Sequence, residues 1–120
     1  MIYNKLVRDK IPEIIEKSGK KAKYRVLEGD ELKAALKNKL VEEANELLNA
    51  ETEEEIIEEI ADVLEVLDGI LMCFGGVEIE SKVYQKAMQK YKEKGRFEKG
   101  YYLESVEAAE NDTDTTDGHK

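Results

Sequence analysis

The amino-acid sequence predicts an all-α fold, an antiparallel bundle of about four helices. Apolar residues recur at helical spacing along three long segments. Residues that typically begin and end helices stand at the boundaries of these segments. The 120 residues include one proline and no tryptophan, a composition that argues against a loop-rich or all-β protein. A chain of this length has room for one core, so we expect a single domain over residues 1–104.

The first expected helix is short and covers residues 9–17. Asp9 can cap it, Pro12 falls in its first turn, and Ser18-Gly19 ends it. Residues 20–29 are expected to form a short extended stretch. The second helix should begin at Asp30 as its N-cap and run to Asn49.

The third expected helix opens with the capping box Thr52-Glu53-Glu54-Glu55 and ends at about Phe74, before Gly75-Gly76. The fourth covers residues 78–94. Residues 96–103 are rich in aromatic side chains and are expected to be extended. The polar, acidic tail of residues 105–120 is expected to be disordered.

Each long helix carries an apolar stripe, and helices of this length joined by short turns favour antiparallel packing. The stripes comprise Leu36, Leu40, Ala44, Leu47 and Leu48, then Ile56, Ile60, Val63, Leu64, Leu67 and Leu71, and finally Val77, Tyr84, Ala87, Met88 and Tyr91. Val66 and Ile70 widen the second stripe beyond what one small core requires. We therefore expect a homodimer or a higher homo-oligomer.

Charge is distributed unevenly along the chain. Residues 42–68 hold 12 acidic side chains and no basic one. A nucleic-acid polymer is therefore not an expected partner, because its binders carry a basic excess. The acidic block must be compensated by solvent, by the flanking basic segments or by a divalent cation.

The single cysteine, the single histidine and the N-terminal residues exclude further classes of function. Cys73 cannot form an internal disulfide, and its apolar surroundings predict a buried thiol in a reducing compartment. His119 is the single histidine, which excludes His-based metal sites and Ser-His or Cys-His catalysis. No membrane span and no signal peptide are visible, so we expect a cytoplasmic location and no membrane partner.

Four carboxylates fit poorly with an ordinary solvated helix face. Glu43 and Glu46 on the second helix, and Glu59 and Asp62 on the third, form two i, i+3 pairs that border apolar surface. Each pair lies on one helix face, with Cβ atoms about 5–6 Å apart. On neighbouring antiparallel helices the pairs can converge, and four carboxylates together cannot all stay ionised without a cation.

An all-oxygen ligand set suits Mg²⁺ and, as a second possibility, Mn²⁺. The alternative interpretation is a charged helix face, because Glu-rich helices produce these spacings by chance.

Two stretches carry a resemblance to a known family. They are Lys39-Leu40-Val41-Glu42-Glu43-Ala44-Asn45-Glu46-Leu47 and Glu58-Glu59-Ile60-Ala61-Asp62-Val63-Leu64. Together they resemble the paired motif of the all-α nucleoside triphosphate pyrophosphatases, the MazG-like superfamily. Tyr3 to Pro12 and Lys94 to Gly100 resemble one branch of it, house-cleaning enzymes for non-canonical nucleotides, with Arg96 where that branch has glycine. The resemblance covers residues 2–103.

The resemblance implies Mg²⁺-dependent cleavage of a nucleoside triphosphate between its α and β phosphates. It implies that Glu43, Glu46, Glu59 and Asp62 are the metal ligands. A water that attacks phosphorus must lose a proton, and Glu42, next to the first ligand, could accept it. A solvated glutamate is the equal alternative for Glu42.

Five basic side chains are candidate phosphate ligands. Lys5, Arg8 and Lys10 precede a short helix, and phosphate favours both cations and helix N-termini. Lys94 and Arg96 are the expected substrate-binding residues at the other end of the chain. Phe97, Tyr101 and Tyr102 either stack on a base or cover the edge of a core.

Two other functions remain open from the sequence. The first is phosphoribosyl-ATP pyrophosphatase of histidine biosynthesis, which shares the carboxylate motif and the reaction of the same superfamily. The second is a non-catalytic helical dimer whose acidic face binds a partner or is simply solvated.

Overall fold

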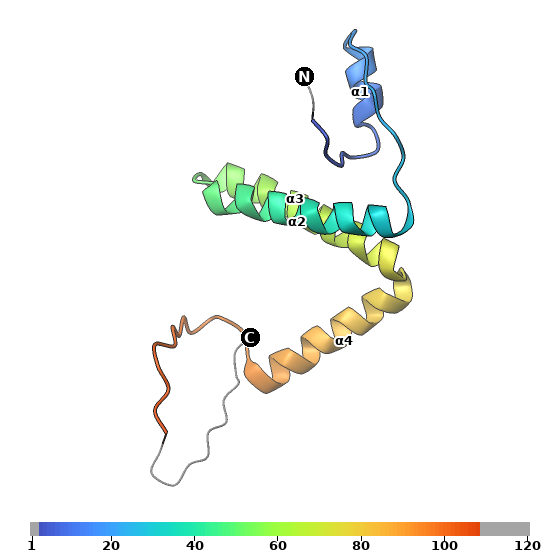
Figure 1. Ribbon diagram of the computed structural model, residues 1–120. Helices are drawn as coiled ribbons and strands as arrows, with labels where there is room; N and C mark the ends of the chain where they lie inside the picture. Colours follow the sequence, from blue (N-terminus) through green and yellow to red (C-terminus); the bar gives the residue numbers. More distant parts are fainter. Residues whose placement is uncertain (1–2, 109–120) are drawn as a thin grey trace. The chain divides into compact units, whose positions relative to one another are not determined.

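The computed structural model describes residues 3–108, which form four α-helices and no strand (Figure 1). The helices are α1 (Ile11–Lys17), α2 (Gly29–Asn49), α3 (Glu53–Phe74) and α4 (Val77–Lys94). The predicted all-α class is therefore confirmed for these residues. The predicted tail falls largely on residues 109–120, which, with His119, lie outside the described residues.

The chain divides into two compact units, residues 1–86 and residues 87–120. The first contains α1, α2, α3 and the beginning of α4, and the second contains the rest of α4 and the segment after it. The four-helix antiparallel bundle and the single domain over residues 1–104 stay predictions.

Within the first unit, α2 and α3 form a helical hairpin through residues 50–52, and they lie side by side (Figure 1). Among residues 3–108, Leu36 of α2 and Val66 of α3 are the only buried apolar side chains. Gly69 lets the helices approach, since a Cβ there would lie 3.0 Å from Leu36 Cδ2. The small core of the hairpin is thus concentrated where Leu36 of α2 packs against α3 near Val66 and Gly69.

The ends of α3 follow the sequence signals. Thr52 accepts a hydrogen bond from the Glu55 backbone N–H at 3.1 Å, and the Glu55 carboxylate accepts one from the Thr52 N–H at 3.2 Å. This reciprocal pair is the predicted capping box. At the other end, Gly75 and Gly76 adopt positive φ, and the Gly76 N–H donates to the Leu71 carbonyl at 2.8 Å. Glycine suits this conformation because it has no Cβ.

Two helix beginnings differ from the prediction. Lys10, rather than Asp9, stands at the N-cap of α1 and makes no side-chain capping bond. Glu28 stands at the N-cap of α2, so Asp30 lies in the first turn instead of capping it. A carboxylate there is still favourable, because the exposed N–H groups of a helix N-terminus attract negative charge. Acidic residues near a helix start therefore do not fix the first residue.

The two segments expected to be extended form neither helix nor strand within the described chain. Residues 20–28 have no regular structure, and residues 97–100 turn, with the Gly100 N–H donating to the Phe97 carbonyl at 3.2 Å. A strand needs a neighbour that satisfies its backbone groups. Neither segment is paired as a strand in the described part. The turn at residues 97–100 contradicts the extended conformation expected there, whereas an extended backbone at residues 20–28 stays a prediction.

The apolar surface of α3 is divided differently from the prediction. Val66 packs inside the hairpin, and Val63 and Ile70 are half-buried. Four side chains of the predicted stripe stay exposed, namely Ile56, Ile60, Leu64 and Leu67, and Ile57, Met72 and Phe74 of the same helix are exposed as well. Cys73, expected to be buried, is a half-buried free thiol. Across the described residues, no helix is both long and apolar enough to cross a membrane.

Candidate metal centre

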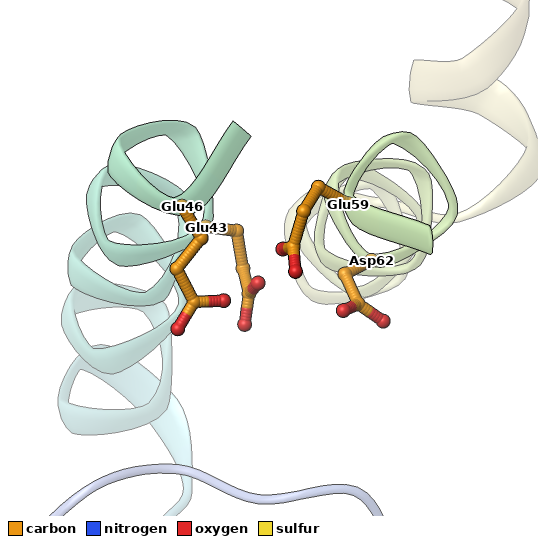
Figure 2. Close-up of side chains that lie close together, drawn as sticks. All are labelled: Glu43, Glu46, Glu59 and Asp62. Carbon is orange, nitrogen blue, oxygen red and sulfur yellow. The ribbon is translucent and has the colours of Figure 1, made fainter. Parts of the chain in front are cut away.

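Four carboxylates from α2 and α3 converge on one side of the hairpin. Figure 2 shows Glu43 and Glu46 on one helix and Glu59 and Asp62 on the other, with their carboxylate groups directed to the same side. One oxygen from each residue lies within 4.8 Å of the corresponding oxygens of the other three. The i, i+3 spacing on each helix and the close packing of the hairpin together produce this arrangement.

Glu43 is the buried member of this carboxylate cluster, with 6% of its surface exposed. Its Oε2 atom and Oε2 of Glu59 are shielded from solvent and have no hydrogen-bond partner among the described residues. Burial, followed by the neighbouring Glu46 carboxylate, raises the pKa of Glu43, against the opposing effect of the Lys39 ammonium group. Unpartnered buried oxygens carry a desolvation cost that a bound cation would remove.

Lys39 is a resident cation beside the cluster, and its side chain is only 17% exposed. Its Nζ atom lies 3.5 Å from Glu43 Oε1 and donates to Glu42 Oε1 at 3.1 Å. Lys5 Nζ lies 3.6 Å from the same Glu42 oxygen. Glu42 is therefore held by two ammonium groups and does not belong to the group of four converging carboxylates.

Arg8 approaches the cluster from the segment before α1. Its Nη2 atom donates to Asp62 Oδ1 at 2.8 Å, joining residues 54 positions apart. Two of the basic residues singled out in the sequence, Lys5 and Arg8, thus lie beside the cluster. Lys10, a third, is exposed at the N-cap of α1.

The two other basic residues predicted to bind substrate, Lys94 and Arg96, belong to the second unit, residues 87–120. Lys94 ends α4, and the Arg96 guanidinium lies 4.3 Å from the centre of the Tyr91 ring. Phe97, Tyr101 and Tyr102 are exposed, so they do not cover a core edge within the described chain. Whether any of these residues binds substrate stays a prediction.

The donor set fits a hard divalent cation. Mg²⁺ binds oxygens at about 2.0–2.1 Å, so two ligands on opposite sides of one ion lie about 4.2 Å apart. The four carboxylate oxygens, all within 4.8 Å of one another, need only small side-chain rotations to reach such distances. These residues therefore fit the cation that the sequence predicts, and binding itself stays a prediction.

The sequence reasoning missed Lys39 as part of this site. Its signal was present, because Lys39 stands three residues before Glu42 and four before Glu43 on one helix face. The contact between Arg8 and Asp62 had no such signal, since it depends on how the chain returns to α3.

Comparisons with known proteins give little information about function. Over 53 residues this chain is 49% identical to an uncharacterized protein of Mycolicibacterium smegmatis, in an alignment covering 44% of this chain and 54% of that protein. The chain thus spans about half the length of the curated relative it matches. No family model and no solved structure matches the chain.

Proposed function

We propose that the protein is a Mg²⁺-dependent nucleoside triphosphate pyrophosphohydrolase that releases a nucleoside monophosphate and pyrophosphate. One observation carries the proposal: four carboxylates from two helices meet within 4.8 Å, and two of them have buried oxygens without a partner. The resemblance of the same residues to the MazG-like motif supports it. The resemblance of Tyr3 to Pro12 and Lys94 to Gly100 to the house-cleaning branch suggests non-canonical nucleotides as substrates. Mn²⁺ is the second candidate cation.

The four carboxylates Glu43, Glu46, Glu59 and Asp62 would hold the cation, and their mutual repulsion favours its capture. When bound, Mg²⁺ polarises phosphoryl oxygens and lowers the pKa of a coordinated water. Glu42 is the proposed general base, held in position by Lys39 and Lys5. A base must come within about 2.6–3.2 Å of the water whose proton it accepts.

The phosphates of the substrate need cationic partners, and this chain offers them close to the cluster. Lys5 and Arg8 already contact its carboxylates or the adjacent Glu42. Lys10, Lys94 and Arg96 are proposed to contribute further contacts. An arginine guanidinium suits this role because it can donate two parallel hydrogen bonds to a phosphate.

The finer aspects of the fold and setting belong to the same proposal. We infer a MazG-like arrangement in which the hairpin of α2 and α3 is completed into a bundle by a second copy of the chain. The exposed apolar side chains of α3 support this inference. A cytoplasmic location would suit the free thiol of Cys73.

Phosphorus NMR on a panel of canonical and modified triphosphates with Mg²⁺ tests the reaction. We expect pyrophosphate and a monophosphate from at least one substrate. The Glu59→Gln variant should lose about a hundred-fold or more of this activity, because it removes a charged ligand. The matched control is Glu54→Gln on the same helix, which should retain activity, since Glu54 is exposed at the start of α3. Release of orthophosphate and a diphosphate instead would contradict the assignment.

Two measurements separate the alternative functions. Including phosphoribosyl-ATP in the panel tests the histidine-biosynthesis enzyme, which would cleave that compound in preference to nucleoside triphosphates. Calorimetric titration with Mg²⁺ or Mn²⁺ tests the non-catalytic dimer, because a purely structural acidic face should show no stoichiometric site.

A further inference from the structure

The segment before α1 supplies two cations to the carboxylate surface of the hairpin. Residues 3–10 form neither helix nor strand in the described chain, so no regular backbone pairing fixes them to α2 or α3. Arg8 instead donates to Asp62 at 2.8 Å, and Lys5 lies 3.6 Å from Glu42. The segment is thus attached to the hairpin at the residues proposed to bind and use the metal.

Arg8 and a metal ion require the same group. Asp62 Oδ1 accepts the guanidinium hydrogen bond, and Asp62 also belongs to the set of four converging carboxylates. A bound divalent cation would compensate the cluster that Arg8 partly compensates now, and it would repel the guanidinium at short range. The nine-tenths-buried Glu43, with its unpartnered Oε2, independently indicates a cation position between the helices.

We propose that Arg8 is a latch: it closes on Asp62 when the cluster has no metal, and a divalent cation displaces it. This inference rests on the proposed metal site and adds an order of events to it. Displacement frees the N–H groups of the guanidinium to donate to an anion that arrives at the metal, such as a phosphate group. The Arg8 guanidinium therefore changes its hydrogen-bond partner from the Asp62 carboxylate to the phosphate of a ligand.

The side-chain Nε–Hε resonances of the arginines report this exchange directly in the full-length protein. The chain has three arginines, Arg8, Arg25 and Arg96, so the signals can be assigned by single substitutions. We expect Mg²⁺ to move the Arg8 signal toward that of free arginine. The Arg25 signal is the internal control, because Arg25 is paired with Glu31 at 2.7 Å and should not respond.

Metal affinity, measured by calorimetry with Mg²⁺ or Mn²⁺ alone, gives the reciprocal readout. Arg8→Gln should bind the ion about two- to five-fold more tightly, the range expected for losing a competing, partly exposed ion pair. Lys10→Gln is the matched control. Lys10 lies two residues from Arg8 and carries the same charge, but it makes no ion pair in the described residues. Helix content by circular dichroism verifies that each variant folds.

The outcomes separate the latch from the metal site. If the metal binds and the Arg8 signal does not move, or if Arg8→Gln and Lys10→Gln change the affinity equally, the latch is overturned and the metal site stands. If no variant binds either ion, the proposed metal site fails and the competition fails with it. The resonance experiment uses the wild-type chain, so it decides the matter even if Arg8→Gln does not fold.

Discussion

Burial of the Glu43 carboxylate disfavours folding, whereas the proposed metal site requires that carboxylate in its charged form. Its carboxylate is buried beside the carboxylates of Glu46 and Asp62, and Lys39 offsets this only in part. Such a group disfavours the folded state when it is ionised. A fold that retains it without a ligand carries a cost that a bound cation would reverse.

The pH dependence of Glu43 follows from the raised pKa of its carboxyl group. The folded state then binds the proton more tightly than the unfolded state does. Stability of the metal-free protein is consequently unaffected below the ordinary glutamate pKa of about 4.3 and declines as the pH rises toward the raised value. Glu43→Gln should remove this decline and melt at a higher temperature than wild type at pH 7, with little difference at pH 4. Calorimetry in the presence of a chelator measures both; a lower melting temperature for the variant at pH 7 would refute the interpretation.

Glu42 differs from the four converging carboxylates because it is paired with the ammonium groups of Lys39 and Lys5. If it is the general base, Glu42→Gln should lower kcat by about 10²- to 10⁴-fold, because that is the usual contribution of a positioned base. Its affinity for Mg²⁺ should stay within a few-fold of wild type, since Glu42 is not among the four converging carboxylates. Glu46→Gln is the comparison, and it should weaken Mg²⁺ binding. Equal loss of metal affinity in both variants would make Glu42 a ligand instead.

At the scale of the helices, the start of α3 is stabilised by local hydrogen bonds. Glu55 accepts from the backbone N–H groups of Glu51 and Thr52, and these bonds lower the pKa of its carboxyl group. The carboxylate form is favoured in the folded state, so its contribution is present above the ordinary glutamate pKa and is lost as the pH falls through the lowered value.

Two substitutions test this capping box by thermal unfolding. Thr52→Ala should destabilise the protein by about 1 kcal/mol, the usual cost of losing an N-cap side chain. Glu55→Gln should reduce stability at pH 7 and have progressively less effect toward pH 3. Glu53→Gln is the matched control, because Glu53 lies in the same first turn without the reciprocal bonds. A pH-independent difference for Glu55→Gln would show that the carboxylate charge is not responsible.

Local patterns predicted most of the helices and the four converging carboxylates. Thr52 marks the beginning of α3 and Gly75-Gly76 mark its end. Both act through hydrogen bonds between residues close in the sequence, so the sequence alone predicts these helix ends. The two carboxylate pairs on α2 and α3 converge because the i, i+3 spacing places each pair on one helix face and the short turn places the two helices side by side. Arg8 on Asp62 was not predictable, since 54 residues separate them. Val66 inside the hairpin was also missed, because periodicity gives an apolar arc without saying which part meets the partner helix.

For the whole molecule, the main feature is how little apolar surface the described chain buries. Leu36 and Val66 are its only buried apolar side chains, whereas Ile56, Ile60, Leu64 and Leu67 remain exposed along α3. Burial of apolar surface is worth about 25 cal/mol per Å². A hairpin with so small a core gains little from it, so association with a second copy is expected to supply the missing burial.

A dimer should form through this exposed stripe of α3, defined by Ile56, Ile60, Leu64 and Leu67. Light scattering on a chain truncated after Glu104 should give twice the mass of one chain, because the removed tail is mainly polar and acidic and is not expected to contribute to the interface. Leu64→Glu should weaken the dimer, since a symmetric interface places the new charges near each other. Leu64 and Asp62 lie about 200° apart around the helix, so the substitution points away from the carboxylate cluster. Tyr24→Glu is the control, because Tyr24 is exposed outside the helices.

The same variant tests whether the two copies share a substrate pocket. If they do, activity of Leu64→Glu should fall at low protein concentration and recover as the dimer forms, while Mg²⁺ affinity of the cluster is preserved. That combination follows because all four proposed ligands belong to one chain, on α2 and α3. A monomeric mass for the truncated wild-type chain at micromolar concentration, with activity retained, would refute the dimer and the shared pocket together.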